Sequence, residues 1–192
     1  ADVQFGDTVV VIGTGPVGLM AVVAAKLRGA GRIIAVGSRA KCRELAIHYG
    51  ASNVVNYKDG DIYAQIMELT GGKRVDRTVI AGGGTEQLPI AYKLTRPGGG
   101  IGDLVAADTP PKIEIDTLDF NRFVAHHKLS GGLCPGGRRR AERLLSLIQY
   151  GRVDPSLMLT HKCYGLDGCR EGFELMHQKP ADLIKPIVYM NV

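Results

Sequence analysis

A glycine-rich hexapeptide near the start of the chain is the segment best suited to bind a charged ligand. It reads Gly13-Thr14-Gly15-Pro16-Val17-Gly18, follows the apolar run Thr8–Ile12 and opens a helix-like segment, Val17–Arg28. Such a turn directs backbone N–H groups and the positive end of a helix dipole at one point, which suits a pyrophosphate. Because a second apolar strand arrives about twenty residues later, the pattern predicts a dinucleotide site. The alternative is a glycine-rich turn that binds nothing.

The residues that end this second strand, Gly37-Ser38-Arg39, indicate which dinucleotide. NAD-binding folds place Asp or Glu here to accept hydrogen bonds from the ribose hydroxyls. A carboxylate would repel a 2′-phosphate, whereas Gly37 leaves room, Ser38 offers a hydroxyl and Arg39 a fixed positive charge. One charge-assisted hydrogen bond contributes about 1.5–3 kcal/mol, so Arg39 alone would favour the phosphorylated cofactor by about tenfold to a hundredfold. The prediction is NADP, with a solvated arginine as the alternative.

Composition limits the other classes of function. The chain has 192 residues, 26 of them Gly and none Trp, with a net charge of +5. That length suits one ordinary domain with a small appendage. The run Arg138–Arg140 is the one approach to a basic nucleic-acid face, but it precedes the apolar residues Leu144, Leu145 and Ile148. A solvated face of an amphipathic helix is therefore expected, and no nucleic-acid partner.

Cysteine and histidine spacing predicts no metal site. The four cysteines show no C-x-x-C pair; they are Cys42, Cys134, Cys163 and Cys169. His126 and His127 are adjacent, so they cannot both face one pocket from a strand, and the other histidines lack partners at ligand spacing. No apolar run approaches the length of a membrane span and no signal peptide is recognised, so we expect a cytoplasmic protein with no membrane partner.

Short β-branched runs alternate with amphipathic segments up to about residue 132. Strands are predicted at Thr8–Ile12, Ile33–Val36, Asn53–Asn56, Arg77–Ala81, Gly100–Val105 and Lys128–Gly131. Helices are predicted at Val17–Arg28, Lys41–Tyr49, Ile62–Thr70 and Gln87–Leu94. Repeated right-handed crossovers give an α/β fold, a doubly wound parallel-sheet Rossmann fold over residues 1–135.

The remaining residues, 136–192, are predicted to form a short C-terminal αβαβ-like appendage. Its expected elements are the helix Arg138–Tyr150, the strand Leu159–Cys163, the helix Asp167–Gln178 and the strand Ile184–Tyr189. These are too few to build a core alone. The tail must therefore pack on the Rossmann unit or on something else.

Several blocks of the chain resemble the NADP-dependent secondary-alcohol branch of the medium-chain, zinc-dependent alcohol dehydrogenases. The blocks are Asp7–Met20, Ala35–Arg39, Gly131–Arg138, Val153–Ser156 and Lys179–Pro186, with a looser segment at Ala106–Val124. The resemblance implies that the glycine turn holds the pyrophosphate. It further implies that Gly37, Ser38 and Arg39, with Tyr57 at the end of the third strand, surround the 2′-phosphate.

The resemblance also adds secondary cofactor residues. Lys179 matches a family lysine that reaches the cofactor phosphates, with a surface lysine as the equal alternative. Ala81 and Gly82 are placed near the adenosine half. Val105 and Ala106 stand beside the nicotinamide, where relatives carry Asn and Tyr, so that pocket is expected to be altered.

In this family a catalytic zinc polarises the alcohol so that hydride can leave for the nicotinamide. Its ligands come from an N-terminal catalytic part that would precede Ala1, and this chain offers no zinc ligands and no catalytic residue of its own. The first hypothesis is therefore the NADP-binding part of a zinc-dependent secondary alcohol dehydrogenase, inactive as an isolated chain. The second is a stand-alone NADP-binding module. A zinc-independent reductase is weaker, because Tyr63 lacks the Y-x-x-x-K spacing of a proton relay.

The sixth strand is expected to form an edge of the sheet. An uncovered edge exposes unpaired backbone groups. Family members pair this edge with its copy, so Lys128–Leu133 is predicted to make a homodimer or part of a tetramer.

Overall fold

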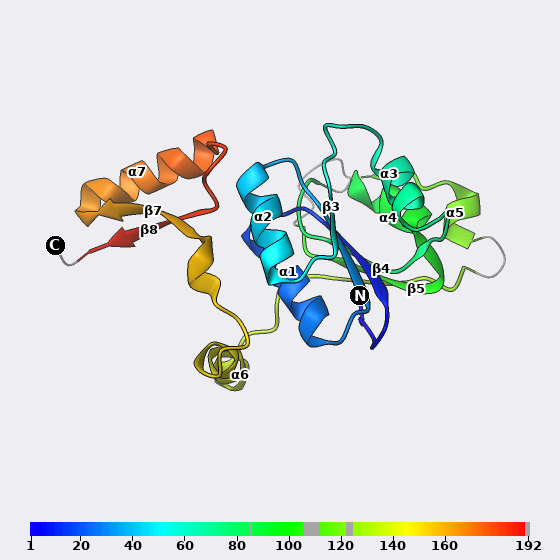
Figure 1. The fold of residues 1–192 in the computed structure, drawn as a ribbon, viewed down its shortest axis with the longest axis horizontal. Coiled ribbons are helices and arrows are strands. Elements are labelled where there is room, and N and C mark those ends of the chain that lie inside the picture. Colours follow the sequence, from blue (N-terminus) through cyan, green and yellow to red (C-terminus); the bar gives the residue numbers. More distant parts are fainter. Residues whose placement is uncertain (85, 106–111, 122–124, 191–192) are drawn as a thin grey trace. The chain divides into compact units, whose positions relative to one another are not determined.

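The computed structural model describes residues 1–84, 86–105, 112–121 and 125–190. It divides into two compact units (Figure 1). Unit 1 comprises Ala1–Ser38 and Cys42–Leu133, and unit 2 comprises Arg39–Lys41 and Cys134–Val192. The functional domain boundary after residue 135 stays a prediction.

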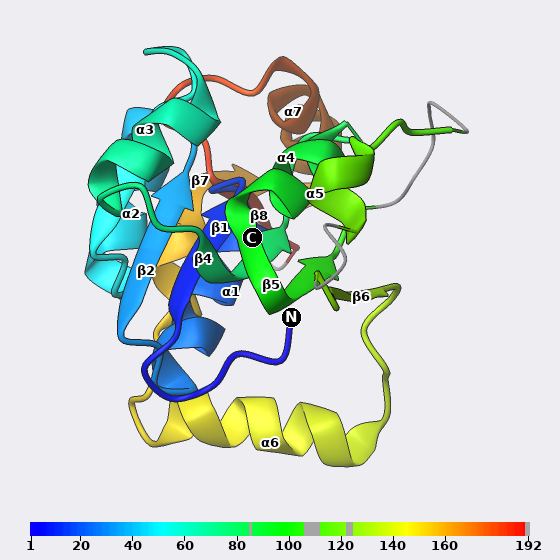
Figure 2. The same cartoon turned by 90° about the vertical axis from the view of Figure 1, so that its right-hand side faces the viewer.

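Unit 1 is built on one parallel sheet. Its strands are β1 (Thr8–Ile12), β2 (Arg32–Val36), β3 (Asn53–Val55), β4 (Val75–Ile80), β5 (Thr95–Asp103) and β6 (Lys128–Gly131). They follow the order β3-β2-β1-β4-β5-β6, and each neighbouring pair is parallel, as Figure 2 shows for β2, β1, β4 and β5. The order reverses at β1 and β4, the switch point where ligands bind in open α/β sheets. The predicted doubly wound Rossmann fold is confirmed.

Helices cover both faces of this sheet. They are α1 (Pro16–Leu27), α2 (Ala40–Tyr49), α3 (Ile62–Leu69), α4 (Gln87–Leu94) and the short α5 (Thr117–Asn121). The helices α1 and α2 lie on one face, and α3 and α4 lie on the other (Figure 1). The carboxyl ends of the strands and the amino ends of several helices therefore meet at one edge of the sheet.

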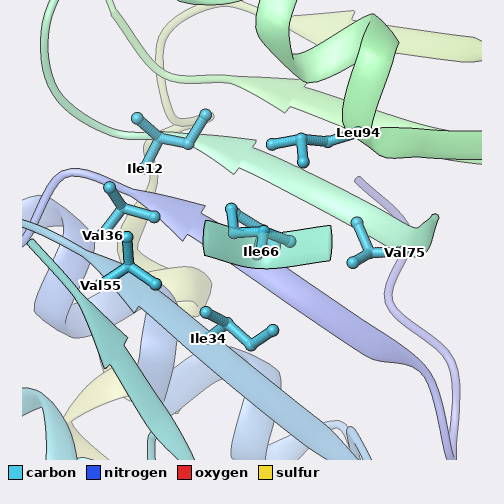
Figure 3. Close-up of a cluster of buried hydrophobic side chains, with 8 residues drawn as sticks. Ile12, Ile34, Val36, Val55, Ile66, Val75 and Leu94 are labelled. Atoms are coloured by element: carbon cyan, nitrogen blue, oxygen red, sulfur yellow. The ribbon is translucent and has the colours of Figure 1, made fainter. Parts of the chain in front are cut away.

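An apolar core lies between the sheet and the helices α3 and α4. Val10 of β1 belongs to it. Ile12 of β1 faces it, and Ile66 of α3 and Leu94 of α4 close it (Figure 3). All four side chains are at most 4% exposed. Burying a side chain of this size contributes about 1.5–3 kcal/mol relative to leaving it exposed. The strand ends that carry the site are therefore held by a packed interior.

Two differences from the predicted elements have local causes. The strand β5 begins at Thr95 rather than Gly100, because Thr95 pairs with Val75 of β4 before a shift in register. The Thr95 hydroxyl also donates to the Ala91 carbonyl (2.7 Å) and contacts the Thr78 hydroxyl (2.8 Å). Its middle reads Pro97-Gly98-Gly99-Gly100, which hides the strand pattern. The helix α5 was not predicted; its start is held by the Asp116 carboxylate, which accepts from the Leu118 N–H at 2.7 Å.

Unit 2 forms the αβαβ-like appendage that the sequence predicts. Its elements are α6 (Arg138–Gln149), the 3-10 helix η1 (Pro155–Met158), β7 (Leu159–Tyr164), α7 (Gly165–Gln178) and β8 (Lys185–Tyr189). The strands β7 and β8 pair in parallel. Within the described residues, α6 has no buried side chain, and Leu145 on α6 and Phe173 on α7 are 62% and 79% exposed. Across the described part of the chain, no helix has the length and apolar character needed to span a membrane.

Candidate cofactor-binding site

The glycine turn after β1 is packed too tightly to accept side chains. Gly13 has φ +102°, and a Cβ there would lie 2.7 Å from the Gly82 nitrogen. A Cβ on Gly18 would lie 1.8 Å from the Gly13 carbonyl oxygen. Real Cβ atoms do not approach other atoms so closely, so these glycines let α1 start directly against the turn. The turn is thus fixed by backbone packing.

The amino end of α1 carries uncapped N–H groups. Gly15 is the N-cap and makes no side-chain cap bond, Pro16 is the first helical residue, and the first turn has no acidic residue. Val17 stands in the same turn and is 55% exposed. The unpaired N–H groups and the positive dipole end suit an anion at this point.

Gly37 at the end of β2 faces the same turn. The Gly13 N–H donates to the Val36 carbonyl at 2.8 Å, which ties the two segments together. Thr14 is 5% exposed, and its Oγ1 lies 1.9 Å from where a Gly37 Cβ would stand. The sequence interpretation of Gly37 was space for a phosphate. The structure gives a different reason for a glycine here, because the Thr14 side chain occupies the place where a Gly37 Cβ would stand.

Ser38 and Tyr57 come together although 19 residues separate them. The Ser38 hydroxyl donates to the Tyr57 Oη at 2.8 Å. Tyr57 follows β3 and is 51% exposed. Two hydroxyl groups therefore stand side by side at the place where a dinucleotide fold otherwise keeps a carboxylate.

Arg39 makes a contact that no local pattern indicated. Its Nη1 donates to the backbone carbonyl of Leu183, which is 1% exposed and precedes β8. No other hydrogen bond of this guanidinium occurs among the described residues, so donors remain for an anion. The two residues are 144 positions apart, and no signal in the sequence connects them.

The secondary candidates lie in different surroundings. Ala81 N–H donates to the Ile12 carbonyl at 2.8 Å, and its Cβ lies 3.5 Å from a Cβ built on Gly18, so it packs at the turn. Val105 packs on an apolar cluster that contains Ile80 and Ile101. Lys179 ends α7 in unit 2 with φ +50°. Ala106 lies outside the described residues. The roles of all predicted site residues stay predictions.

A cleft of about 440 Å³ opens at the carboxyl edge of the sheet in unit 1. Ile12 lines it from β1, Gly13 from the turn that follows, Val36 from β2 and Tyr57 from the segment after β3. Gly82 lines it from the loop after β4. Its volume is typical of a small-molecule site. The glycine turn, the end of β2 and Tyr57 thus share one cavity.

Further residues of this cleft were missed by the sequence analysis. Gly60 and Asp61 lie between β3 and α3, Ile62 is the first residue of α3, and Gln87 and Ile90 belong to α4. They form no motif, but each follows the carboxyl end of a strand, where a parallel sheet gathers ligand-binding residues. Their position after a predicted strand was the one feature of the sequence that could have indicated them.

One ionisable group beside the cleft has a shifted pKa. The Gly84 N–H donates to the Glu86 carboxylate at 2.7 Å and holds the pKa of this carboxyl below its ordinary value. Gln87 adds a longer hydrogen bond to the same carboxylate, 3.3 Å from Nε2 to Oε1. Glu86 therefore stays ionised at neutral pH, and its carboxylate joins the loop after β4 to the Gln87 side chain.

The described residues contain no group of three His, Cys, Asp or Glu side chains that could hold a metal ion. His127 is used in packing, with Nε2 3.1 Å from the Thr95 carbonyl oxygen and its ring edge-on to Tyr92. The described residues therefore do not fit a zinc ion.

Comparison with protein families and with known proteins places these features in context. Residues 16–149 match the family model described as zinc-binding dehydrogenase. The chain is 52% identical over 190 residues to the NADP-dependent isopropanol dehydrogenase of Thermoanaerobacter brockii, which covers 99% of this chain and 54% of that protein. It is 47% identical to the protein of the same name from Entamoeba histolytica, over 100% of this chain and 52% of that one.

Solved structures are similar over the same extent. The alcohol dehydrogenase TADH of Thermus sp. ATN1 superposes with a TM-score of 0.82 at 27% identity, covering 98% of this chain and 52% of that one. The 2R,3R-butanediol dehydrogenase of Bacillus subtilis gives a TM-score of 0.83 at 27% identity, covering 100% and 53%. The chain thus spans about half the length of the relatives that it matches.

Proposed function

Because this chain belongs to the zinc-binding dehydrogenase family, we propose that it is the NADP(H)-binding part of an alcohol dehydrogenase acting on short secondary alcohols and ketones. The name of the 52% identical relative, an NADP-dependent isopropanol dehydrogenase, supports the cofactor and the substrate class. The observation that carries the proposal is the Ser38–Tyr57 hydroxyl pair, which stands at the end of β2 beside a glycine-lined turn. A cytoplasmic location belongs to the same proposal.

The chain's own residues bind and orient the cofactor in this proposal. The N–H groups at the start of α1 hold the pyrophosphate, since Gly13 and Gly18 allow close backbone approach. Ser38, Tyr57 and Arg39 hold the 2′-phosphate. When bound, NADPH supplies the hydride, and these contacts fix the position from which it leaves.

Calorimetric titration of the 192-residue chain with NADP+ and NAD+ tests the cofactor. We expect NADP+ to bind at least about tenfold more tightly, which corresponds to one charge-assisted contact with the extra phosphate. Equal affinities would reject the proposal.

Ketone-dependent NADPH oxidation, measured with and without added zinc, tests the activity of the chain by itself. Turnover that needs no metal would contradict both hypotheses: that the chain is part of a zinc-dependent dehydrogenase, and that it is a stand-alone NADP-binding module without activity.

Self-association through β6 is part of the proposal. This strand ends the sheet order, and its residues Lys128–Gly131 are all exposed. An unpaired edge of this kind can join a second copy by backbone hydrogen bonds. We expect a dimer or tetramer by light scattering, and replacing Leu129 with Pro should shift it toward the monomer, because proline cannot donate to the ladder.

A further inference from the structure

Part of the cleft is lined by residues that the phosphate groups do not need. The pyrophosphate is assigned to the glycine turn and the ribose phosphate to the end of β2. The remaining side chains of the lining are those of Asp61 and Ile62 at the start of α3 and of Gln87 and Ile90 of α4, beside the glycines Gly60, Gly82 and Gly83. The base of the same nucleoside is bonded to the ribose carbon next to the one that carries this phosphate, so it is the nearest remaining group of the cofactor to occupy this part.

Two apolar side chains form fixed walls there. Ile62 and Ile90 are partly buried, and both pack against the core cluster that contains Ile66 and Leu94. Their rotamers are therefore restrained by the interior. Flat apolar faces and a polar edge characterise a purine, so walls of this kind suit its faces and leave its edge to the polar residues.

Asp61 offers an acceptor of fixed orientation. It is the N-cap of α3, and its Oδ1 accepts from the Ala64 N–H at 2.8 Å. Among the described residues no hydrogen bond reaches its Oδ2. An ionised carboxylate accepts but cannot donate, so this oxygen favours an amino group and disfavours a carbonyl at the same place.

Gln87 offers both a donor and an acceptor. Its Nε2 directs one N–H to the Glu86 carboxylate at 3.3 Å, which leaves the second N–H and the amide oxygen. Its side chain lies along the loop after β4, where a Cβ on Gly83 would be 2.9 Å from the Gln87 Cγ. A primary amide can pair with a ring nitrogen whether or not that nitrogen is protonated. Gln87 therefore supplies affinity without choosing between purines, and the choice rests with Asp61.

We infer that Asp61 and Gln87 bind the polar edge of the cofactor's base, and that Asp61 selects adenine, with its exocyclic amino group, over hypoxanthine, with a carbonyl there. This inference rests on the proposed function, because it names the base specificity of the same site. Asp61 is exposed at the rim of the cleft, so the expected selectivity is modest.

Titration with NADP+ and with nicotinamide hypoxanthine dinucleotide phosphate tests the inference. The unmodified chain should prefer NADP+ by about three- to tenfold, the effect of one partly exposed hydrogen bond to a charged group. Asp61→Asn keeps the helix cap, since Asn and Asp cap equally well. Its amide can donate to the carbonyl of hypoxanthine, so the preference should fall to about one or reverse.

Asp59→Asn is the matched control. Asp59 lies two residues from Asp61 and does not line the cleft, and its replacement removes the same charge as Asp61→Asn. It should change both affinities together and leave their ratio unchanged. The inference is overturned if the unmodified chain binds NADP+ and the hypoxanthine analogue with nearly equal affinity, or if Asp61→Asn leaves the ratio of the two affinities unchanged. In either case the proposed function still stands as long as the chain binds NADP+. Failure of the unmodified chain to bind NADP+ would overturn both.

Discussion

The glycine turn after β1 and the side-chain cluster at the end of β2 serve one ligand by different physical means. The turn is built from close backbone contacts, and a Cβ at Gly18 would lie 1.8 Å from a neighbouring carbonyl oxygen. The cluster is built from side chains at the surface, where the Ser38 hydroxyl meets the half-exposed Tyr57. Backbone packing tolerates almost no change, whereas exposed hydrogen bonds can be removed one at a time. Substitutions should therefore act in an all-or-none way in the turn and in graded steps in the cluster.

Gly18→Ala should have the largest effect. The added methyl group forces the start of α1 away from the Gly13 carbonyl, so the N–H groups no longer converge on the pyrophosphate. We expect Kd above about 1 mM for NADP+ and NAD+ alike, with a loss of folding stability of about 1–3 kcal/mol or more. Calorimetry and thermal unfolding measure these two quantities.

The control for this change is Gly136→Ala. A Cβ at Gly136 meets no atom within 4 Å among the described residues, and its φ is not positive. Binding and unfolding should stay as in the unmodified chain. If Gly18→Ala also bound NADP+ normally, the assignment of the pyrophosphate to this turn would be wrong.

Gly37→Ala should have the second largest effect. Gly37 precedes Ser38 of the cluster in the chain, but it packs against Thr14 of the glycine turn. Its Cβ would meet the Thr14 Oγ1 at 1.9 Å. We expect lower affinity for both cofactors and a lower unfolding temperature. Adding Thr14→Ala to this variant removes the hydroxyl and should restore part of the cofactor affinity and part of the unfolding temperature. A double variant no better than Gly37→Ala would show that space for the ligand, and not contact with Thr14, requires the glycine.

Arg39→Ala should separate the two cofactors. Losing one charge-assisted hydrogen bond should weaken NADP+ binding by about tenfold to a hundredfold and leave NAD+ binding nearly unchanged. Parallel titrations measure both, and Arg139→Ala, which removes the same charge from exposed α6, is the control. Equal losses for the two cofactors would mean that Arg39 acts through the carbonyl of Leu183 and the fold of the chain, not through the phosphate.

Tyr57→Phe should have the smallest effect. It removes the acceptor of the Ser38 hydroxyl at a half-exposed position. NADP+ affinity should fall about two- to tenfold, as for the loss of one neutral hydrogen bond, with NAD+ unaffected. Tyr150→Phe, at the exposed end of α6, is the matched hydroxyl deletion.

A double-mutant cycle that combines Tyr57→Phe with Ser38→Ala tests whether the two hydroxyl groups bind the phosphate together. Strictly additive losses of NADP+ affinity would contradict a shared phosphate contact.

The two regions also differ in how far sequence reasoning could reach them. The turn is contiguous, so its spacing between a strand and a helix was sufficient to predict its position. Ser38 and Tyr57 were predicted together only through a family resemblance, and the structure brings their hydroxyl groups to 2.8 Å. Asp61 and Gln87 belong to no motif and became visible only as the lining of a cavity.

The sequence by itself determined the alternation of strands and helices, the place of the glycine turn and the absence of an acidic residue at the end of β2. These are local properties, set by hydrophobic period and by residues adjacent in the chain. Only the tertiary structure decided that Thr14 fills the space beside Gly37, that Arg39 donates to a carbonyl 144 residues away and that Asp61 shares a cleft with Gln87. Such contacts depend on which segments the folded chain brings next to one another, and the spacing of residues along the chain does not encode that directly.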